Sequence, residues 1–121
     1  MKILVVSAYY PPHHIGGYEL GCRDVVNQLR KRGHQVRVLT SDFQTANNSQ
    51  PEEPEVIREL HRESPDHPLK KKTECRKFIR VVDDFRPGLV YFWSQSELCY
   101  WLPMVARWRG CPAAFFLSDT N

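Results

Sequence analysis

The chain has 121 residues, of which 41% are hydrophobic and 26% charged, and its formal net charge is +3. This composition is ordinary for one soluble globular domain, and the charge is too small to indicate a nucleic-acid partner by itself. No run approaches the roughly 18 apolar residues of a membrane span. The opening MKILVV lacks the apolar length of a secretory signal, so we expect a cytoplasmic protein. Its four widely spaced cysteines favour reduced thiols over disulfides or a zinc site.

The first forty residues predict a strand, a helix and a second strand. Ile3 to Val6 form a continuous apolar run, as expected of a parallel strand that is buried on both faces. After Gly16 and Gly17, apolar residues recur with helical spacing, and Gly33 supplies a stop. The segment HQVRVLTS then predicts the second strand. The apolar stripe of the helix consists of Cys22, Val25, Val26 and Leu29.

The middle of the chain predicts a loop, a short strand and a second helix. Asp42 to Pro54 carries little that can be buried, so we expect a mobile loop there. Glu55 to Leu60 is a candidate third strand, and the helix that follows must end before Pro87. One face of that helix carries Cys75, Phe78, Ile79, Val82 and Phe85.

The last third predicts two more strands around a third helix. The strands are Leu89 to Trp93 and Ala113 to Leu117. The helix spans Glu97 to Arg109, and Pro103 either kinks it or starts its second half. Alternation of strands and helices predicts an α/β protein with a mostly parallel sheet, in a Rossmann-like three-layer α/β/α arrangement.

The loop after the first strand is the leading candidate site, because parallel sheets bind ligands at the carboxyl ends of their strands. Gly16 and Gly17 allow a ligand to approach the main chain closely. The N–H groups of the following helix can then face an anion such as a diphosphate. The glycine pair is equally compatible with a simple turn. Asp42 after the second strand suits a dinucleotide site, but GGYELG has the wrong glycine spacing for that fingerprint.

Further along, aromatic and basic residues offer weaker candidates. Among Trp93, Tyr100, Trp101 and Trp108 we expect most to lie in the core. Tyr100 and Trp101 are also candidates for a groove that binds a ligand, because sugars and lipids pack on aromatic faces. The lysines at 70–72 predict a solvated face or a contact with an anionic membrane. The scattered histidines do not predict a metal site.

Three stretches resemble the family 4 glycosyltransferases of the GT-B type. KILVVSAYYPPHHIGGYELGCRDVVNQLRKRGHQVRVLTS is similar to the opening of those proteins, with its Gly-Gly, a Glu-bearing helix and Arg-Gly-His. RPGLVYFWSQ resembles a later strand that follows Arg-Pro, and GCPAAFFLSDTN resembles the strand that ends in a polar pair, usually His-Asp. The resemblance covers nearly all of the chain except its polar middle.

The resemblance implies that residues 1–121 are the amino-terminal, acceptor-side domain of a GT-B enzyme, in incomplete form. A carboxyl-terminal donor-binding domain would be absent, so the chain alone is expected to be inactive. The implied enzyme is a hexosyltransferase-like, retaining glycosyltransferase. It would use a nucleotide-sugar donor without a metal or other cofactor. Its acceptor would be a carbohydrate or a lipid-linked molecule, for which Tyr100 and Trp101 are the candidate acceptor groove. Such an acceptor suits peripheral contact with the inner face of the membrane.

The same resemblance assigns roles to particular residues. Gly16, Gly17, Tyr18 and Glu19 match the part that binds the substrate and its phosphates, although Glu19 equally suits the helix dipole. Ser118 and Asp119 match the His-Asp pair near the sugar. Ser118 departs from the family, and a hydroxyl cannot replace an imidazole as a proton carrier.

Two other functions stay open at this point. One is a non-catalytic binding or assembly module that acts with a partner subunit. The other is a dinucleotide-binding fragment of an oxidoreductase, for which Asp42 is the supporting residue.

Overall fold

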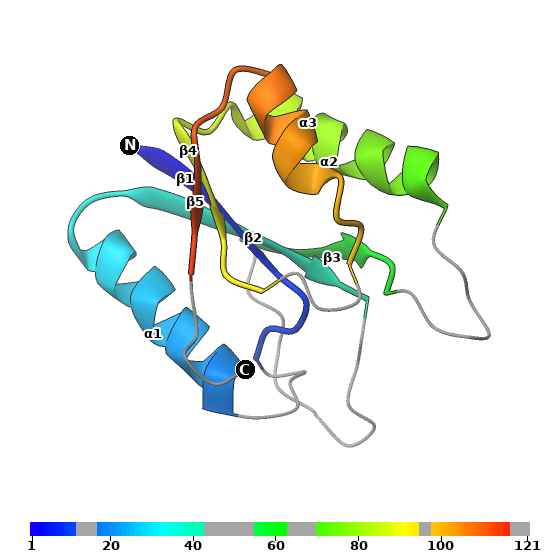
Figure 1. Cartoon of the computed structure of the whole chain (residues 1–121). Helices are drawn as coiled ribbons and strands as arrows, with labels where there is room; N and C mark the ends of the chain where they lie inside the picture. Colours follow the sequence, from blue (N-terminus) through cyan, green and yellow to red (C-terminus); the bar gives the residue numbers. More distant parts are fainter. Residues whose placement is uncertain (12–16, 43–54, 63–69, 95–97, 117–121) are drawn as a thin grey trace.

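The computed structural model describes residues 1–11, 17–42, 55–62, 70–94 and 98–116 (Figure 1). Within these residues, strands and helices alternate almost throughout. In chain order they are β1 (Lys2–Ser7), α1 (Gly17–Lys31), β2 (Gln35–Ser41), β3 (Val56–Leu60), α2 (Lys71–Phe85), β4 (Leu89–Phe92), α3 (Leu102–Trp108) and β5 (Ala113–Phe115).

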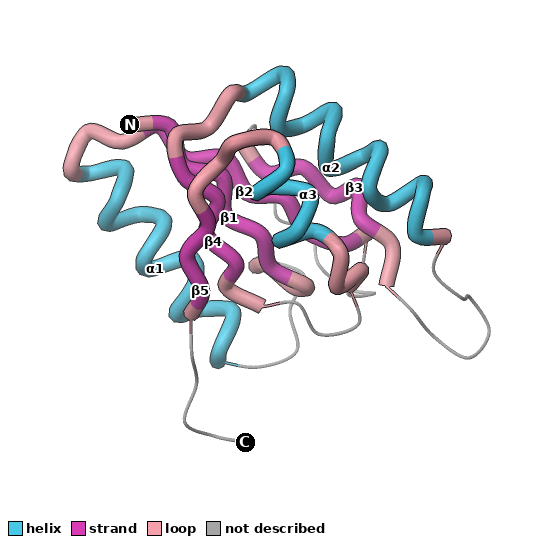
Figure 2. The backbone as a smooth tube through the Cα atoms, turned by 45° about the horizontal axis from the view of Figure 1, so that its top comes forward, coloured by secondary structure: helices cyan, strands magenta, loops and turns pink. Residues whose placement is uncertain are grey.

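The strands form one parallel sheet in the order β3-β2-β1-β4-β5. Helix α1 covers one face of this sheet, whereas α2 and α3 cover the other (Figures 1 and 2). The predicted Rossmann-like three-layer fold is therefore confirmed. Ser7 at the end of β1 pairs with Thr40 near the end of β2, so the carboxyl ends of the central strands meet at one edge.

Two apolar clusters, one on each face, hold the layers together. Alternate side chains of a strand point to opposite faces. Leu4 and Val6 accordingly join the cluster under α2 and α3, while Ile3 and Val5 join the one under α1. All four are at most 4% exposed, which confirms that β1 is buried on both faces. None of the helices in the described ranges is long and apolar enough to cross a bilayer.

The two longer helices follow their predicted stripes. In α1, Cys22 and Val26 are fully buried, and the other two stripe residues are half-buried. Helix α2 ends at Phe85, two residues before Pro87, as the ring of that proline requires. Its last turn closes with the Arg86 N–H, which donates to the Val82 carbonyl at 2.7 Å, and the left-handed backbone of Arg86 (φ 52°) then turns the chain out of the helix.

The third helix is shorter than predicted. Helix α3 begins only at Leu102, and residues 98–101 ahead of it are not helical. Pro103 lies in its first turn, the one place in a helix where the missing N–H of proline costs nothing. Pro103 therefore starts this helix and does not kink a longer one.

The prediction that most of the four aromatic residues lie in the core is wrong. Trp93 is buried at 6% exposed, but Trp101 is 38%, Tyr100 68% and Trp108 75% exposed. The inner face of α3 is filled by Leu102 and Ala106 instead. Trp108 lies on the exposed side of this helix, and Tyr100 and Trp101 come before its first residue.

Candidate functional site

The chain that follows β1 is packed into the carboxyl edge of the sheet. Ala8, Tyr9, Tyr10 and Pro11 are all buried. Ser7 Oγ donates a hydrogen bond to the Tyr9 carbonyl at 2.7 Å. From the end of β2, Ser41 Oγ donates to the Ala8 carbonyl. Buried main-chain carbonyls just beyond the end of a strand have no partner in the sheet, so they need hydrogen-bond donors such as these hydroxyl groups.

An arginine of β3 clamps the same segment. The Arg58 guanidinium donates from Nη1 to the Tyr10 carbonyl at 3.2 Å and from Nη2 to the Pro11 carbonyl at 3.0 Å. Just beyond β3, Arg62 donates to the Tyr9 hydroxyl at 2.9 Å, and its guanidinium carbon lies 5.3 Å from the centre of that ring. The planar, forked donor set of arginine suits such paired contacts. We call Arg58, Arg62 and the residues they hold, 9–11, the strand-end clamp.

Helix α1 begins at Gly17, six residues after Pro11, the last residue of the clamp. Because α1 follows a parallel strand and packs back along it, its amino terminus lies at the carboxyl edge, with the positive end of its dipole there. Glu19 sits in the first turn and is 7% exposed. Of the other predicted phosphate-side residues, Gly16 lies outside the described residues, and of Tyr18 only the helical backbone is described.

The first turns of α1 pack on the buried side chain of Trp93. A Cβ added to Gly21 would lie 3.6 Å from the Trp93 ring, so the helix packs directly on that ring. Trp93 in turn stacks on Phe116 with ring centres 3.9 Å apart. Burial raises the pKa of the Cys22 thiol from 9.0 to about 12; a hydrogen bond with Ser7 opposes this rise and the Glu19 charge adds to it. This thiol is therefore neutral and structural.

The raised pKa of Cys22 predicts a loss of stability in alkali. The unfolded chain releases this proton near pH 9, while the folded chain keeps it up to about pH 12. The stability from this group is thus complete below pH 9 and is lost as the pH rises toward 12. We expect urea unfolding at pH 10.5 to show a free energy about 2 kcal/mol lower than at pH 8 from this group.

The matched variants for this prediction are Cys22→Ala and Cys111→Ala. Cys22→Ala should flatten the pH dependence between pH 8 and 10.5. Cys111 is only partly buried, and its removal should leave most of the slope. An unchanged slope in Cys22→Ala would contradict the assignment.

Tyr100 and Trp101, the predicted acceptor pair, lie on the other face of the sheet from α1. Their rings meet edge to face, 6.4 Å apart. Lys71 Nζ, from the start of α2, lies 5.0 Å from the Tyr100 ring centre and 4.9 Å from that of Trp101. It also donates to the Tyr100 hydroxyl at 3.1 Å. That hydrogen bond, and then the positive charge, lower the pKa of Tyr100.

Asp42, the residue that suits a dinucleotide site, follows β2 at the same edge. Its carboxylate is 3.6 Å from Nδ1 of His61, and its main-chain N–H donates to the Leu60 carbonyl at 2.8 Å. The carboxylate is therefore placed beside the end of β3, where His61 lies.

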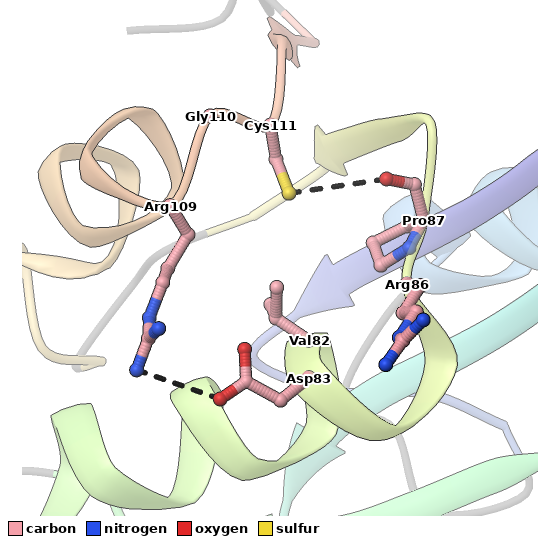
Figure 3. Close-up of a pocket in the computed structure, with 7 residues that line it drawn as sticks. All are labelled: Val82, Asp83, Arg86, Pro87, Arg109, Gly110 and Cys111. Carbon is pink, nitrogen blue, oxygen red and sulfur yellow. Dashed lines mark hydrogen bonds and ion pairs between the residues drawn. The ribbon is translucent and has the colours of Figure 1, made fainter.

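A hollow of about 540 Å³ lies at the opposite, amino-terminal edge (Figure 3). The residues that line it lie at the ends of α2 and α3 and just ahead of β4 and β5. Arg109 and Asp83 form an ion pair of 3.4 Å across it, and Cys111 Sγ donates to the Pro87 carbonyl at 3.8 Å. Burial, and then the Asp83 charge, raise the pKa of Cys111. This hollow is separate from the clamp and from the start of α1.

Ser118 and Asp119 lie outside the described residues, so their positions relative to the clamp are not described. What the described residues define is a Rossmann-like domain with a candidate ligand edge, formed by the clamp and the start of α1. A family model described as Glycosyltransferase Family 4 matches residues 15–117. The chain therefore belongs to glycosyltransferase family 4. Among curated proteins, none matches the chain significantly.

Proposed function

We propose that the chain is the acceptor-side domain of a retaining glycosyltransferase with the two-domain GT-B architecture. A second domain would hold most of the nucleotide-sugar donor, and no metal would take part. The observation that carries this proposal is the family match, which spans residues 15–117 and includes α1 and β4. The position of the amino terminus of α1 at the carboxyl edge supports it, because that edge is where parallel α/β sheets bind ligands.

In this proposal the start of α1 faces the diphosphate of the donor. Gly17 adds no side chain between the main chain and the diphosphate, and the clamp holds residues 9–11 at the same edge of the sheet. Glu19 and the pair Ser118 and Asp119 would contact the sugar. Tyr100 and Trp101 would contact a carbohydrate or lipid-linked acceptor through their exposed rings.

The isolated chain should bind nucleotide-sugars only weakly. A few main-chain hydrogen bonds of about 1 kcal/mol each and a dipole contribution of similar size correspond to a Kd of ~1 mM or weaker. An NMR titration of the 121-residue chain with UDP-glucose or GDP-mannose should shift amides at Gly17–Glu19. The chain alone should transfer no sugar.

Gly17→Val is the matched variant for this titration, because it places a branched side chain where the diphosphate is proposed to lie. It should abolish the shifts while the circular dichroism spectrum stays unchanged. NAD⁺ serves as the control ligand. Micromolar binding of NAD⁺ with shifts near Asp42 would favour an oxidoreductase and contradict the proposal, as would sugar transfer by this chain alone.

A further inference from the structure

Two of the four thiols meet between α2 and the segment that precedes α3. Cys75 lies in the second turn of α2, and Cys99 lies shortly before Leu102, where α3 begins. Both belong to the apolar cluster on this face of the sheet, in which Cys99 is 2% exposed and Cys75 is half-buried. Their side chains are close enough for a hydrogen bond between the two thiols.

An independent set of contacts links the same two segments. Lys71 lies one turn before Cys75 on α2, and Tyr100 directly follows Cys99. Lys71 Nζ donates to the Tyr100 hydroxyl at 3.1 Å and lies 4.9 Å from the centre of the Trp101 ring. We call Lys71, Tyr100 and Trp101 the lysine–aromatic cluster. The thiol pair therefore lies beside a second link between α2 and residues 98–101.

The other two thiols contact oxygen atoms instead. Cys22, under α1 on the opposite face of the sheet, has Ser7 as its hydrogen-bond partner. Cys111 donates to the Pro87 carbonyl at 3.8 Å. All four thiols are free in the structure. A disulfide needs two cysteines whose side chains already lie against each other. Of the four cysteines, all of which are described, Cys75 and Cys99 are the pair that meets this condition.

We propose that Cys75 and Cys99 form a reversible disulfide when the folded chain meets a low-molecular-weight disulfide such as oxidised glutathione, and that this bond holds residues 98–101 on α2. The wide spacing of the cysteines along the sequence does not indicate such a pair, because only the fold brings the two thiols together. This inference goes beyond the proposed function, since it requires neither a nucleotide-sugar nor a transfer reaction.

The exposure of the two thiols sets the order of the chemical steps. Cys75, the more exposed, loses its proton to solvent, and its thiolate attacks one sulfur of oxidised glutathione. The S–S bond of the oxidant breaks, and one glutathione leaves as a thiolate that takes up a proton. A mixed disulfide remains on Cys75.

The buried thiol completes the reaction. Cys99 also loses its proton to solvent, and its thiolate attacks the Cys75 sulfur and expels the second glutathione, which is protonated in turn. The protein loses two hydrogen atoms and forms one S–S bond, while one molecule of oxidised glutathione is reduced to two thiols. An excess of reduced glutathione reverses both steps.

The bond would restrict both the unfolded and the folded chain. It would close the stretch between residues 75 and 99, which contains β4. Closing a loop limits the conformations of the unfolded chain, so oxidation should raise the Tm by about 10 °C. In the folded chain it would tie residues 98–101 to α2, so amide hydrogen exchange at Tyr100 and Trp101 should slow.

Incubation of the 121-residue chain with oxidised glutathione, followed by peptide mapping without a reductant, tests the proposal. Burial raises the pKa of Cys75, so an alkaline buffer near pH 8.5 supplies the thiolate that the exchange needs. Trypsin cleaves after Lys72 and Arg76, so the peptide 73–76 should be recovered linked to the peptide that carries Cys99. Reduced glutathione should release it.

Single substitutions separate the two steps. Cys99→Ser should stop after the first step and accumulate one glutathione on Cys75. Cys75→Ser should leave Cys99 unmodified, because that thiol is 2% exposed. Cys111→Ser is the matched control, and it should form the same link and show the same rise in Tm as the wild-type chain.

Three results would overturn the inference. They are a wild-type chain in which peptide 73–76 carries glutathione but no link, a link from Cys75 to another cysteine or another chain, and unchanged hydrogen exchange at Tyr100 and Trp101 after oxidation. The mapping uses the wild-type chain, so it stands even where a variant fails to fold. It also uses no nucleotide-sugar, so this inference and the proposed function can fail separately.

Discussion

Replacing Phe92 with alanine is expected to lower the free energy of unfolding by about 3–5 kcal/mol, the usual cost of truncating a fully buried phenylalanine. Phe92 is 1% exposed and lies on β4 under α2 and α3. Its ring centre is 6.2 Å from that of Phe78 and 5.4 Å from that of Phe115. The cavity would open between the sheet and α2, where the surrounding rings cannot collapse into it. Urea denaturation followed by circular dichroism measures the effect.

Phe115→Ala is the matched control, since the same type of side chain is removed from the other half of the same stacked pair. Phe115 is 49% exposed, so its loss should cost only about 1 kcal/mol. Equal losses from the two variants would show that β5 and its neighbours bury more surface than the structure indicates.

The fold could be predicted largely because its strongest signals are local. The run Ile3 to Val6 marks a doubly buried strand, and the spacing of Cys22, Val26 and their neighbours marks a helix. Neither signal depends on contacts elsewhere in the chain. The role of Pro103, in contrast, could not be decided from its local sequence. Whether a proline kinks a helix or starts one depends on whether the preceding residues are helical. Here residues 98–101 are not helical, and Leu98 and Cys99 are buried in the core.

The side chains that build the carboxyl edge could not be predicted in this way. Arg58 holds carbonyls that lie 48 and 47 residues earlier in the chain. Glu74 is 2% exposed in α2, where its carboxylate accepts from the His61 main-chain N–H at 3.0 Å. Charged residues in a strand or a helix usually indicate solvent. The only sequence signal for the role of Arg58 was its position within the short strand VIREL.

The candidate site shows the same division. The start of α1 follows from the position of a glycine pair after a strand, whereas the burial of Glu19 does not, because a carboxylate in a first helical turn usually indicates solvent. The separation of Tyr100 and Trp101 from α1, on opposite faces of the sheet, follows from the strand order. That order is set by packing across the whole sheet, and the sequence pattern does not contain it.

Arg58→Ala should have the largest effect at the candidate site. It removes two hydrogen bonds from a charged donor, each of which is worth about 1.5–3 kcal/mol when buried. Because Arg58 is only partly buried, we expect the variant to lose about 2–3 kcal/mol of unfolding free energy. Hydrogen exchange at the Tyr10 amide should accelerate. In the two-domain transferase that we propose, a displacement of about 1 Å at the carboxyl edge would lower turnover about 100-fold.

Arg80→Ala is the control, because Arg80 pairs with the neighbouring β3 residue Glu59 at 2.7 Å but is 68% exposed. An exposed ion pair of this kind contributes about 0–1 kcal/mol, and neither exchange at Tyr10 nor turnover should change. Arg58→Lys, which keeps the charge without the fork, should fall between the two. If Arg58→Ala loses stability but still turns over at the wild-type rate, the clamp supports the fold alone and does not position the donor.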